Sequence, residues 1–195
     1  MKGKEYPQEA FELTKVGEMA IDDSSWYGYF ALCLINLSKK KYEKALADAD
    51  KLITLAPESA DSYALMAVIF NCVGRPGEAI EMVEKAMQLN PSIPAWYLST
   101  LATAYAISGR PTEAVAKYKR VFDRNPSHGD KFNAHLSLAI LYVELGQEED
   151  ARTEAEEILK LVPNFSVEVW GQRNPNKDQA QIEQGVATLR KAGLN

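Results

Sequence analysis

Two histidines are the residues best suited to metal binding or acid–base chemistry in this sequence. His128 and His135 are seven residues apart, so both would lie on one face of a helix if a single helix held them. Gly129 lies between them, however, and indicates that His128 belongs to a loop before the helix. A zinc site also needs more ligands than a pair supplies. We therefore expect no metal site.

Other catalytic patterns are missing from the sequence. It has no Gly-rich phosphate loop, no nucleophile elbow and no HExxH zinc motif. The two cysteines, Cys33 and Cys72, are too few for a disulfide framework or a metal cluster. Acidic runs at 148–150 and 154–157 fit a solvated helix face with favourable charge near a helix N-terminus. We expect no catalytic residue and no cofactor, and therefore a protein that is not an enzyme.

The composition is that of an ordinary globular protein. The chain has 195 residues, of which 46% are hydrophobic and 25% are charged. A formal net charge of −5 argues against nucleic acid as a partner, because such binding needs a basic face. No apolar run approaches the ~18 residues of a membrane span, and residues 1–11 lack the apolar core of a signal peptide. We expect a cytoplasmic protein that does not bind membranes; an export signal already removed is the alternative.

One pattern occurs four times along the chain. It is clearest in GRPGEAIEMVEKAMQLNP at 74–91 and GRPTEAVAKYKRVFDRNP at 109–126. Related copies are KKYEKALADADKLITLAP at 40–57 and GQEEDARTEAEEILKLVP at 146–163. The closing prolines, at 57, 91, 126 and 163, follow one another at intervals of 34, 35 and 37 residues. A period near 34 predicts a repeat architecture with two helices in each unit.

Turn residues and an apolar stripe explain the spacing. Gly74 falls where one helix ends, a place that favours positive φ, and Pro76 falls in the first turn of the next helix. Apolar residues then recur at i, i+4 and i+7, as Ala79, Val83 and Ala86 do, and form one helical stripe. The predicted helix pairs are 26–38 and 42–55, 60–73 and 76–89, 94–108 and 111–124, and 131–145 and 147–161.

The first helix of each unit carries a second pattern. Its middle position is always small, and the four residues there are Cys33, Ala67, Ala102 and Ala139. A small residue lets two helices approach closely, and a large residue three positions on, such as Phe70, fills the neighbouring gap. Cys33 is therefore expected to be a packing residue. With Ala79 and Pro91, these positions make residues 26 to 165 resemble the tetratricopeptide repeat family.

This resemblance implies an all-α fold, a tetratricopeptide solenoid. Helix-turn-helix units would stack into a right-handed superhelix with a concave groove. The four units would be 26–59, 60–93, 94–128 and 131–165. Residues 1–25 would form an N-terminal helix, which is either a simple cap or the second helix of a preceding repeat. Residues 166–195 would form a turn and a C-terminal capping helix over the last repeat.

The tail resembles a narrower group of proteins. Phe165-Ser166, Pro175, Lys177-Asp178 and LRKAGL at 189–194 are similar to the end of tetratricopeptide tracts in bacterial adenylate/guanylate cyclase-like proteins. Asn176 departs from the aromatic residue that is usual there. The resemblance implies a bacterial protein in a regulatory setting. It transfers no catalytic residue, because these 195 residues contain no cyclase domain.

The geometry of the family implies which side chains line the groove. None of its sixteen groove positions is Lys or Arg in this chain, so a clamp for a C-terminal carboxylate is not expected. The groove would instead be apolar and would suit a partner peptide or an amphipathic helix. The residues expected to bind the partner are Tyr27, Phe30, Leu34, Trp96, Thr103, Leu136 and Ile140.

Three functions fit these observations. The sequence favours a non-catalytic module that binds a protein or peptide partner in bacterial signalling or regulation. One alternative is the C-terminal regulatory region of a nucleotide cyclase-like enzyme. The other is a self-associating scaffold that forms homo-oligomers. The C-terminal helix of the same chain could also fill the groove and leave no room for a partner.

Overall fold

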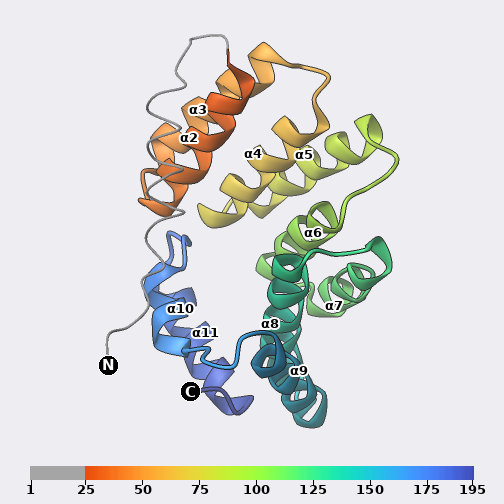
Figure 1. Ribbon diagram of the computed structural model, residues 1–195, viewed down its shortest axis with the longest axis vertical. Coiled ribbons are helices and arrows are strands. Elements are labelled where there is room, and N and C mark those ends of the chain that lie inside the picture. The colour runs from red at the N-terminus through yellow and green to blue at the C-terminus, as the bar shows by residue number, and fades with distance from the viewer. Residues whose placement is uncertain (1–24) are drawn as a thin grey trace.

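The computed structural model describes residues 25–195, so the expected N-terminal helix lies outside the described residues. In the described part ten α-helices and one 3₁₀ helix follow one another, without any strand. Successive helices pair into hairpins that stack into a curved solenoid (Figure 1). The helices are α2 (Trp26–Ser38), α3 (Tyr42–Leu55), α4 (Ala60–Cys72), α5 (Pro76–Leu89), α6 (Ala95–Ile107), α7 (Pro111–Lys119), the 3₁₀ helix η1 (Phe122–Arg124), α8 (His128–Glu144), α9 (Glu148–Leu161), α10 (Val167–Arg173) and α11 (Gln179–Lys191).

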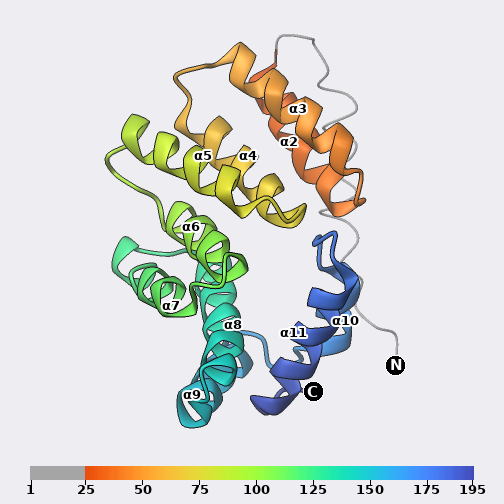
Figure 2. The ribbon, with the colours of Figure 1, turned by 180° about the vertical axis from the view of Figure 1, so that it is seen from behind.

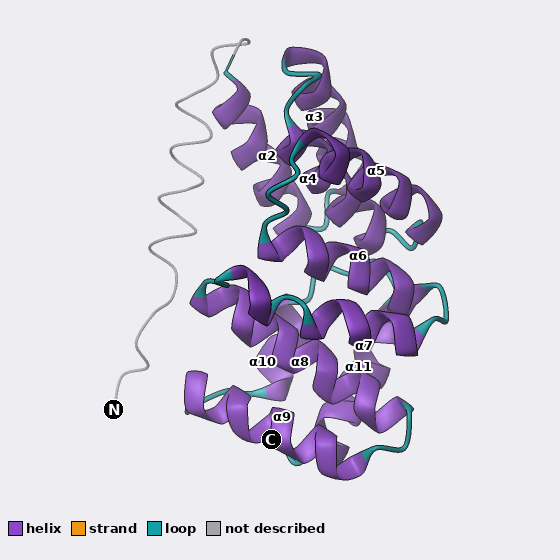
Figure 3. Cartoon of the chain, turned by 90° about the vertical axis from the view of Figure 1, so that its right-hand side faces the viewer, coloured by secondary structure: helices purple, strands orange, loops and turns teal. Residues whose placement is uncertain are grey.

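The stack is held together by apolar residues between neighbouring helices. The hairpins lie one above another along the stack (Figure 3). One apolar core runs through α2 to α6 and another through α6 to α11, and each joins successive hairpins. The small residue at the middle of each first helix has no exposed surface; these residues are Cys33, Ala67, Ala102 and Ala139. The distance between packed helices depends on the side chains at their contact, so small residues let helices approach closely, as Cys33 Sγ of α2 does to the Ala45 carbonyl oxygen of α3 at 3.7 Å. None of the described helices is both long and apolar enough to cross a membrane.

The observed helices follow the predicted ones closely, with two departures. α7 ends at Lys119, and η1 and a left-handed Asn125 follow it. α8 begins at His128, three residues earlier than predicted. The reason is a capping box, in which the Asp130 N–H donates to Ser127 Oγ at 3.1 Å and the Ser127 N–H donates to Asp130 Oδ2 at 3.0 Å. The prediction that His128 belongs to a loop was therefore wrong.

The turn within each of the four repeat hairpins contains one residue with left-handed backbone. Gly74, Gly109 and Gly146 have φ values of 76°, 72° and 75°. The first hairpin has Lys40 at the same place, with φ of 55°. A side chain at positive φ crowds the following carbonyl, and glycine avoids this cost.

Each helix of the C-terminal hairpin begins with a side-chain N-cap. Ser166 Oγ accepts the N–H of Val169 at 3.3 Å, and Asp178 Oδ1 accepts the N–H of Ala180 at 2.9 Å. Four buried apolar residues of this segment share one core with α8 and α9; they are Val167, Leu189, Ala192 and Leu194. The hairpin α10–α11 therefore covers the open face of the last repeat, as solenoids require.

We predict that the turns respond to substitution in opposite directions. Gly109→Ala should lower the free energy of unfolding by about 1 kcal/mol, because a Cβ there meets no atom within 4 Å and only backbone strain remains. Lys40→Gly should raise it by up to about 1 kcal/mol, because it relieves the same strain. Urea unfolding of both variants and the parent provides the measurement. A loss of stability in Lys40→Gly would contradict this account of the turns.

Candidate binding cleft on the concave face

The tip of the C-terminal hairpin crosses the concave side of the solenoid. There the Lys177 N–H donates to the carbonyl oxygen of Cys72, at the end of α4, over 2.8 Å. The Lys177 ammonium also lies 5.7 Å from the centre of the Tyr42 ring, a cation–π contact. Seen from behind, α10 and α11 stand opposite α6 and α8 (Figure 2). The hairpin thus connects the last repeat to the first two and occupies part of the groove.

Two glycines let α10 and α11 pack closely. A Cβ on Gly185 would lie 2.9 Å from Cη2 of Trp170, and a Cβ on Gly171 would lie 2.8 Å from Cγ2 of Val186. Ile140 of α8 comes within 4.0 Å of the same position on Gly185. Glycine therefore leaves the space in which the Trp170 ring lies, beside the concave face of α8.

A cleft of about 370 Å³ remains between the hairpin and the repeats. One side of it is built from α4, α6 and α8, with a contribution from α7, and the opposite side from α10. Its lining combines apolar and polar side chains and includes Val68, Asn71, Trp96, Thr103, Leu136 and Trp170. A concave, mostly apolar site with a few convergent polar groups is the usual form of a binding site.

Hydroxyl groups in the cleft have partners within the protein. Thr100 Oγ1 donates to the Trp96 carbonyl at 2.8 Å. Thr103 Oγ1 lies 2.9 Å from the Ser99 carbonyl and 2.7 Å from the Tyr118 hydroxyl. These hydroxyls are therefore already engaged and leave little hydrogen-bonding capacity for the other polar groups of the cleft.

Asn71 differs from these residues. It is 5% exposed, and its Nδ2 donates to the Thr100 carbonyl at 2.9 Å. Its Oδ1 has no hydrogen-bond partner, although it is buried, and this is the one such side-chain atom found in residues 25–195. Buried polar atoms nearly always have a partner.

The electrostatics of the cleft disfavour nucleophilic chemistry. Among the described residues that line it, Asp130 is the one charged side chain. Burial raises the pKa of the Cys72 thiol to about 12, and burial also raises the pKa of Tyr118. Both groups therefore remain protonated at neutral pH. A protonated, buried thiol is a poor nucleophile.

The structure brings four of the seven predicted groove residues together. Trp96, Thr103 and Leu136 line the cleft, and Ile140 lies next to it, beside Trp170. These residues come from α6 and α8, the first helices of the third and fourth hairpins.

The other three predicted residues lie on α2, away from this cleft. Tyr27 is 81% exposed and Leu34 is 44% exposed. Phe30 packs on Trp26, with ring centres 5.2 Å apart. The seven residues therefore form two separate groups in the described structure.

Part of the cleft was not predicted. Trp170 and Asn174 belong to the tail, which was expected either to cap the last repeat or to fill the groove, and not to form one wall of an open cleft. Gly171 and Gly185 were the available signal, since glycine within a helix can mark a close approach of another element. The unpaired oxygen of Asn71 had no signal in the sequence, because it depends on what surrounds the side chain.

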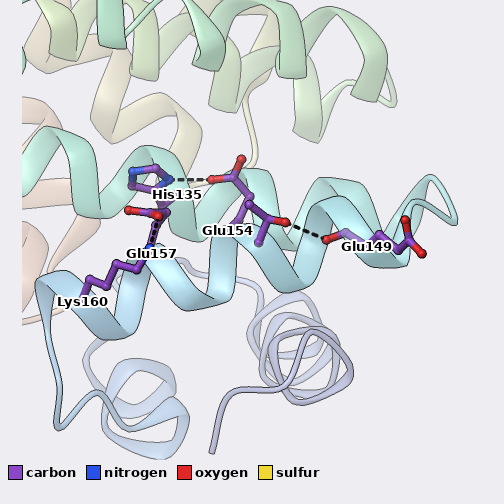
Figure 4. A network of polar contacts seen from close by, with 6 residues as sticks. His135, Glu149, Glu154, Glu157 and Lys160 are labelled. Carbon is purple, nitrogen blue, oxygen red and sulfur yellow. Dashed lines mark hydrogen bonds and ion pairs between the residues drawn. The ribbon is translucent and has the colours of Figure 1, made fainter.

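The two histidines form no shared site. His128 is exposed at the start of α8, whereas the His135 ring faces α9. His135 Nδ1 lies 2.5 Å from Glu154 Oε2, and its ring centre lies 4.7 Å from that of Phe122 (Figure 4). Glu157 belongs to the same polar network, where its ion pair with Lys160 lowers its pKa. The network ties α8 to α9; in the described part of the chain no cluster of three or more suitable side chains could hold a metal.

Stacked helical hairpins with glycine turns, small residues between helices and a concave cleft define a tetratricopeptide solenoid. The family model described as "Psidin, N-terminal TPR repeats region" matches residues 35–171. The chain belongs to this family of tetratricopeptide repeat proteins.

Solved structures share the fold over nearly the whole chain. PilW, a widely conserved type IV pilus biogenesis factor, has a TM-score of 0.68 at 20% identity, over 96% of this chain and 83% of its own. TTC0263, a thermophilic tetratricopeptide protein of Thermus thermophilus, has a TM-score of 0.67 at 17% identity, over 95% of this chain and 91% of its own. YrrB, a tetratricopeptide protein with an unusual peptide-binding site, has a TM-score of 0.53 at 20% identity, over 94% of this chain and 91% of its own. No curated protein matches the chain significantly.

We predict that the packing of the hairpin depends on Gly185. Gly185→Ala should lower the free energy of unfolding by about 1 kcal/mol or more, because the new Cβ crowds the Trp170 ring. The matched control is Gly77→Ala in α5, where a Cβ meets nothing within 4 Å; helix propensity should make this change neutral or stabilising by up to about 1 kcal/mol. Thermal and urea unfolding would measure both. Equal stabilisation by the two substitutions would show that α10 does not pack on Gly185.

Proposed function

We propose that the protein is a non-catalytic protein-interaction module that binds a protein or peptide partner on its concave face. The observation that carries this proposal is the cleft between the repeats and α10, in which Trp96, Leu136 and Trp170 lie beside polar groups. Tryptophan is enriched among the residues that contribute most to binding energy. A partner that buries these rings would gain apolar contact on two sides.

The chemistry of the described residues supports a binding role rather than catalysis. Cys33 and Cys72 both have pKa values raised by burial to about 12, so neither is a thiolate at neutral pH. His135 is engaged with Glu154 between α8 and α9, away from the residues that line the cleft. The described cleft therefore presents apolar rings, amides and hydroxyls, which suit recognition.

The setting of this interaction is a further part of the proposal. We place the module in a bacterium, in signalling or regulation, on the strength of the sequence of its tail, and in the cytoplasm as the sequence analysis expects. The same tail favours a second candidate, the C-terminal regulatory region of a nucleotide cyclase-like enzyme. In that case the cleft would bind a partner in the same way and the repeats would pass the signal to a catalytic domain. Self-association through the exposed α2 residues Tyr27 and Leu34 is the third candidate.

We predict that Trp96 is essential for partner binding. A displayed library of random 16-residue peptides would be selected on the complete protein, and affinities of the selected peptides would be measured by calorimetry. Trp96→Ala should weaken binding by about 2 kcal/mol, roughly 30-fold, since it removes a large ring from the cleft. Leu159→Ala is the control, because Leu159 is an exposed apolar residue on α9, outside the cleft.

Two results would overturn this proposal. One is that no peptide is enriched above an unrelated control protein. The other is that selected peptides bind Trp96→Ala as tightly as the parent while the variant keeps its melting temperature. If the protein instead elutes as a concentration-dependent oligomer that Tyr27→Ala dissociates, the self-associating scaffold becomes the better description.

A further inference from the structure

The C-terminal hairpin α10–α11 is anchored firmly at its base, beside α8 and α9. The apolar side chains there are buried in the core shared with those helices; they are Val167, Leu189, Ala192 and Leu194. The Val167 N–H also donates to the Asn195 carbonyl at 3.2 Å and so joins the start of α10 to the last residue. Burial of apolar surface is the main favourable term in packing, so this end of the hairpin is held as strongly as the repeats are.

The tip of the hairpin is held by a different kind of contact. Among the described residues, the apolar core of α2 to α6 includes none from α10 or α11. The exposed Lys177 makes the connection instead, with its N–H on the Cys72 carbonyl and its ammonium over the Tyr42 ring. One neutral hydrogen bond and one exposed cation–π contact stabilise much less than several buried side chains do.

Open space separates the tip half of the hairpin from the repeats. A cleft of about 320 Å³ lies between the ends of α6 and α8 and a row of amide side chains on the hairpin, which are Asn174, Asn176, Gln181 and Gln184. A second cleft, of about 440 Å³, lies between the tip and the turn that follows α4. Amides that face such space can bond to water, so moving them away from the repeats breaks few protein contacts.

The hairpin carries its own internal contacts. Asn176 Nδ2 donates to Gln181 Oε1 at 2.9 Å, and the Asn176 N–H donates to Asn174 Oδ1 at 2.9 Å. Nearer the base, the Trp170 ring packs on Gly185 of α11. These contacts lie within the hairpin and do not depend on α3 or α4. A unit that is internally bonded but weakly attached at one end can open without unfolding the rest of the protein.

We propose that the hairpin α10–α11 is a gate over the concave cleft, which swings about its base beside α8 and α9 and is latched at its tip by Lys177 on α3 and α4. In the closed state α10 forms one wall of the cleft of about 370 Å³. In the open state the concave faces of α4 and α6 are accessible from that side. This inference goes beyond the proposed function, because the motion belongs to the chain itself and is measured without any partner.

The test measures two distances between nitroxide labels in the complete protein by pulsed electron resonance. Cys33 and Cys72 are first replaced by alanine, which keeps the backbone carbonyl at position 72. One label is placed on Glu58→Cys, in the exposed turn between α3 and α4. The second label is on Gln179→Cys at the tip in one protein and on Lys191→Cys near the base in the other, both at exposed positions.

The latch is then weakened in two steps. Lys177→Ala removes the cation–π contact and should raise the ratio of open to closed tip distances about twofold to fivefold. Lys177→Pro also removes the N–H donor and should raise the ratio by a further fivefold to tenfold, the effect of one neutral hydrogen bond. The Glu58-to-Lys191 distance should stay single and unchanged throughout. Lys85→Ala, which removes an exposed ammonium on α5, is the matched control and should leave both distances as in the parent.

Two results would overturn the gate. One is a single, unchanged tip distance in both Lys177 variants, which would mean that the tip is fixed by more than the latch. The other is a base distance that lengthens together with the tip distance, which would mean that the hairpin undocks as a whole. Circular dichroism and melting show whether Lys177→Pro stays folded, and Lys177→Ala carries the test if it does not. Peptide binding that depends on Trp96 would stand whichever result is found, so the two proposals can fail separately.

Discussion

Close approach between helices at one small residue in each repeat is the constraint on which the structure depends. Cys33, Ala67, Ala102 and Ala139 occupy equivalent positions and have no exposed surface. Because these side chains are short, neighbouring helices can approach closely, as Cys33 Sγ of α2 does to the Ala45 carbonyl oxygen of α3 at 3.7 Å. Continuous apolar cores then join successive hairpins. The curvature of the resulting stack creates a concave side. The cleft exists because the C-terminal hairpin then lies across that side and leaves part of it open.

Most of the solenoid could be predicted from the sequence because it is built from local signals. Each of these signals acts over a few residues: the apolar stripe occurs four times, the turn glycine three times (Gly74, Gly109 and Gly146) and the first-turn proline twice (Pro76 and Pro111). The departures were local too. At α8 the capping box of Ser127 and Asp130 outweighed Gly129 and started the helix at His128. In the first turn Lys40 adopts the conformation that glycine has in the others.

The cleft could be predicted only in part, because it depends on contacts between distant segments. Residues on α6 and α8 were found, since repeat geometry alone places them on the concave face. The opposite wall, formed by α10, depends on a backbone hydrogen bond from the Lys177 N–H to the Cys72 carbonyl. A bond between two backbone groups leaves no side-chain pattern from which it could be predicted. The unsatisfied oxygen of Asn71 appears only when its surroundings are known. The terminal hairpin therefore turns a general groove into a cleft with two walls.

Hydrogen exchange at the Lys177 amide, followed by NMR in the complete protein, tests the central claim most directly. The structure predicts slow exchange there, because the N–H donates to the Cys72 carbonyl across the concave face. The neighbouring turn of the hairpin contains Asn176 and Asp178, whose amides bond within the turn, and they provide an internal comparison. If the Lys177 amide is protected from exchange at least as strongly as the amides of Asn176 and Asp178, the result supports a hairpin that crosses the groove and bonds to Cys72. Exchange at the rate of an unstructured peptide would mean that the hairpin does not cross the groove, and the cleft would then lack its second wall.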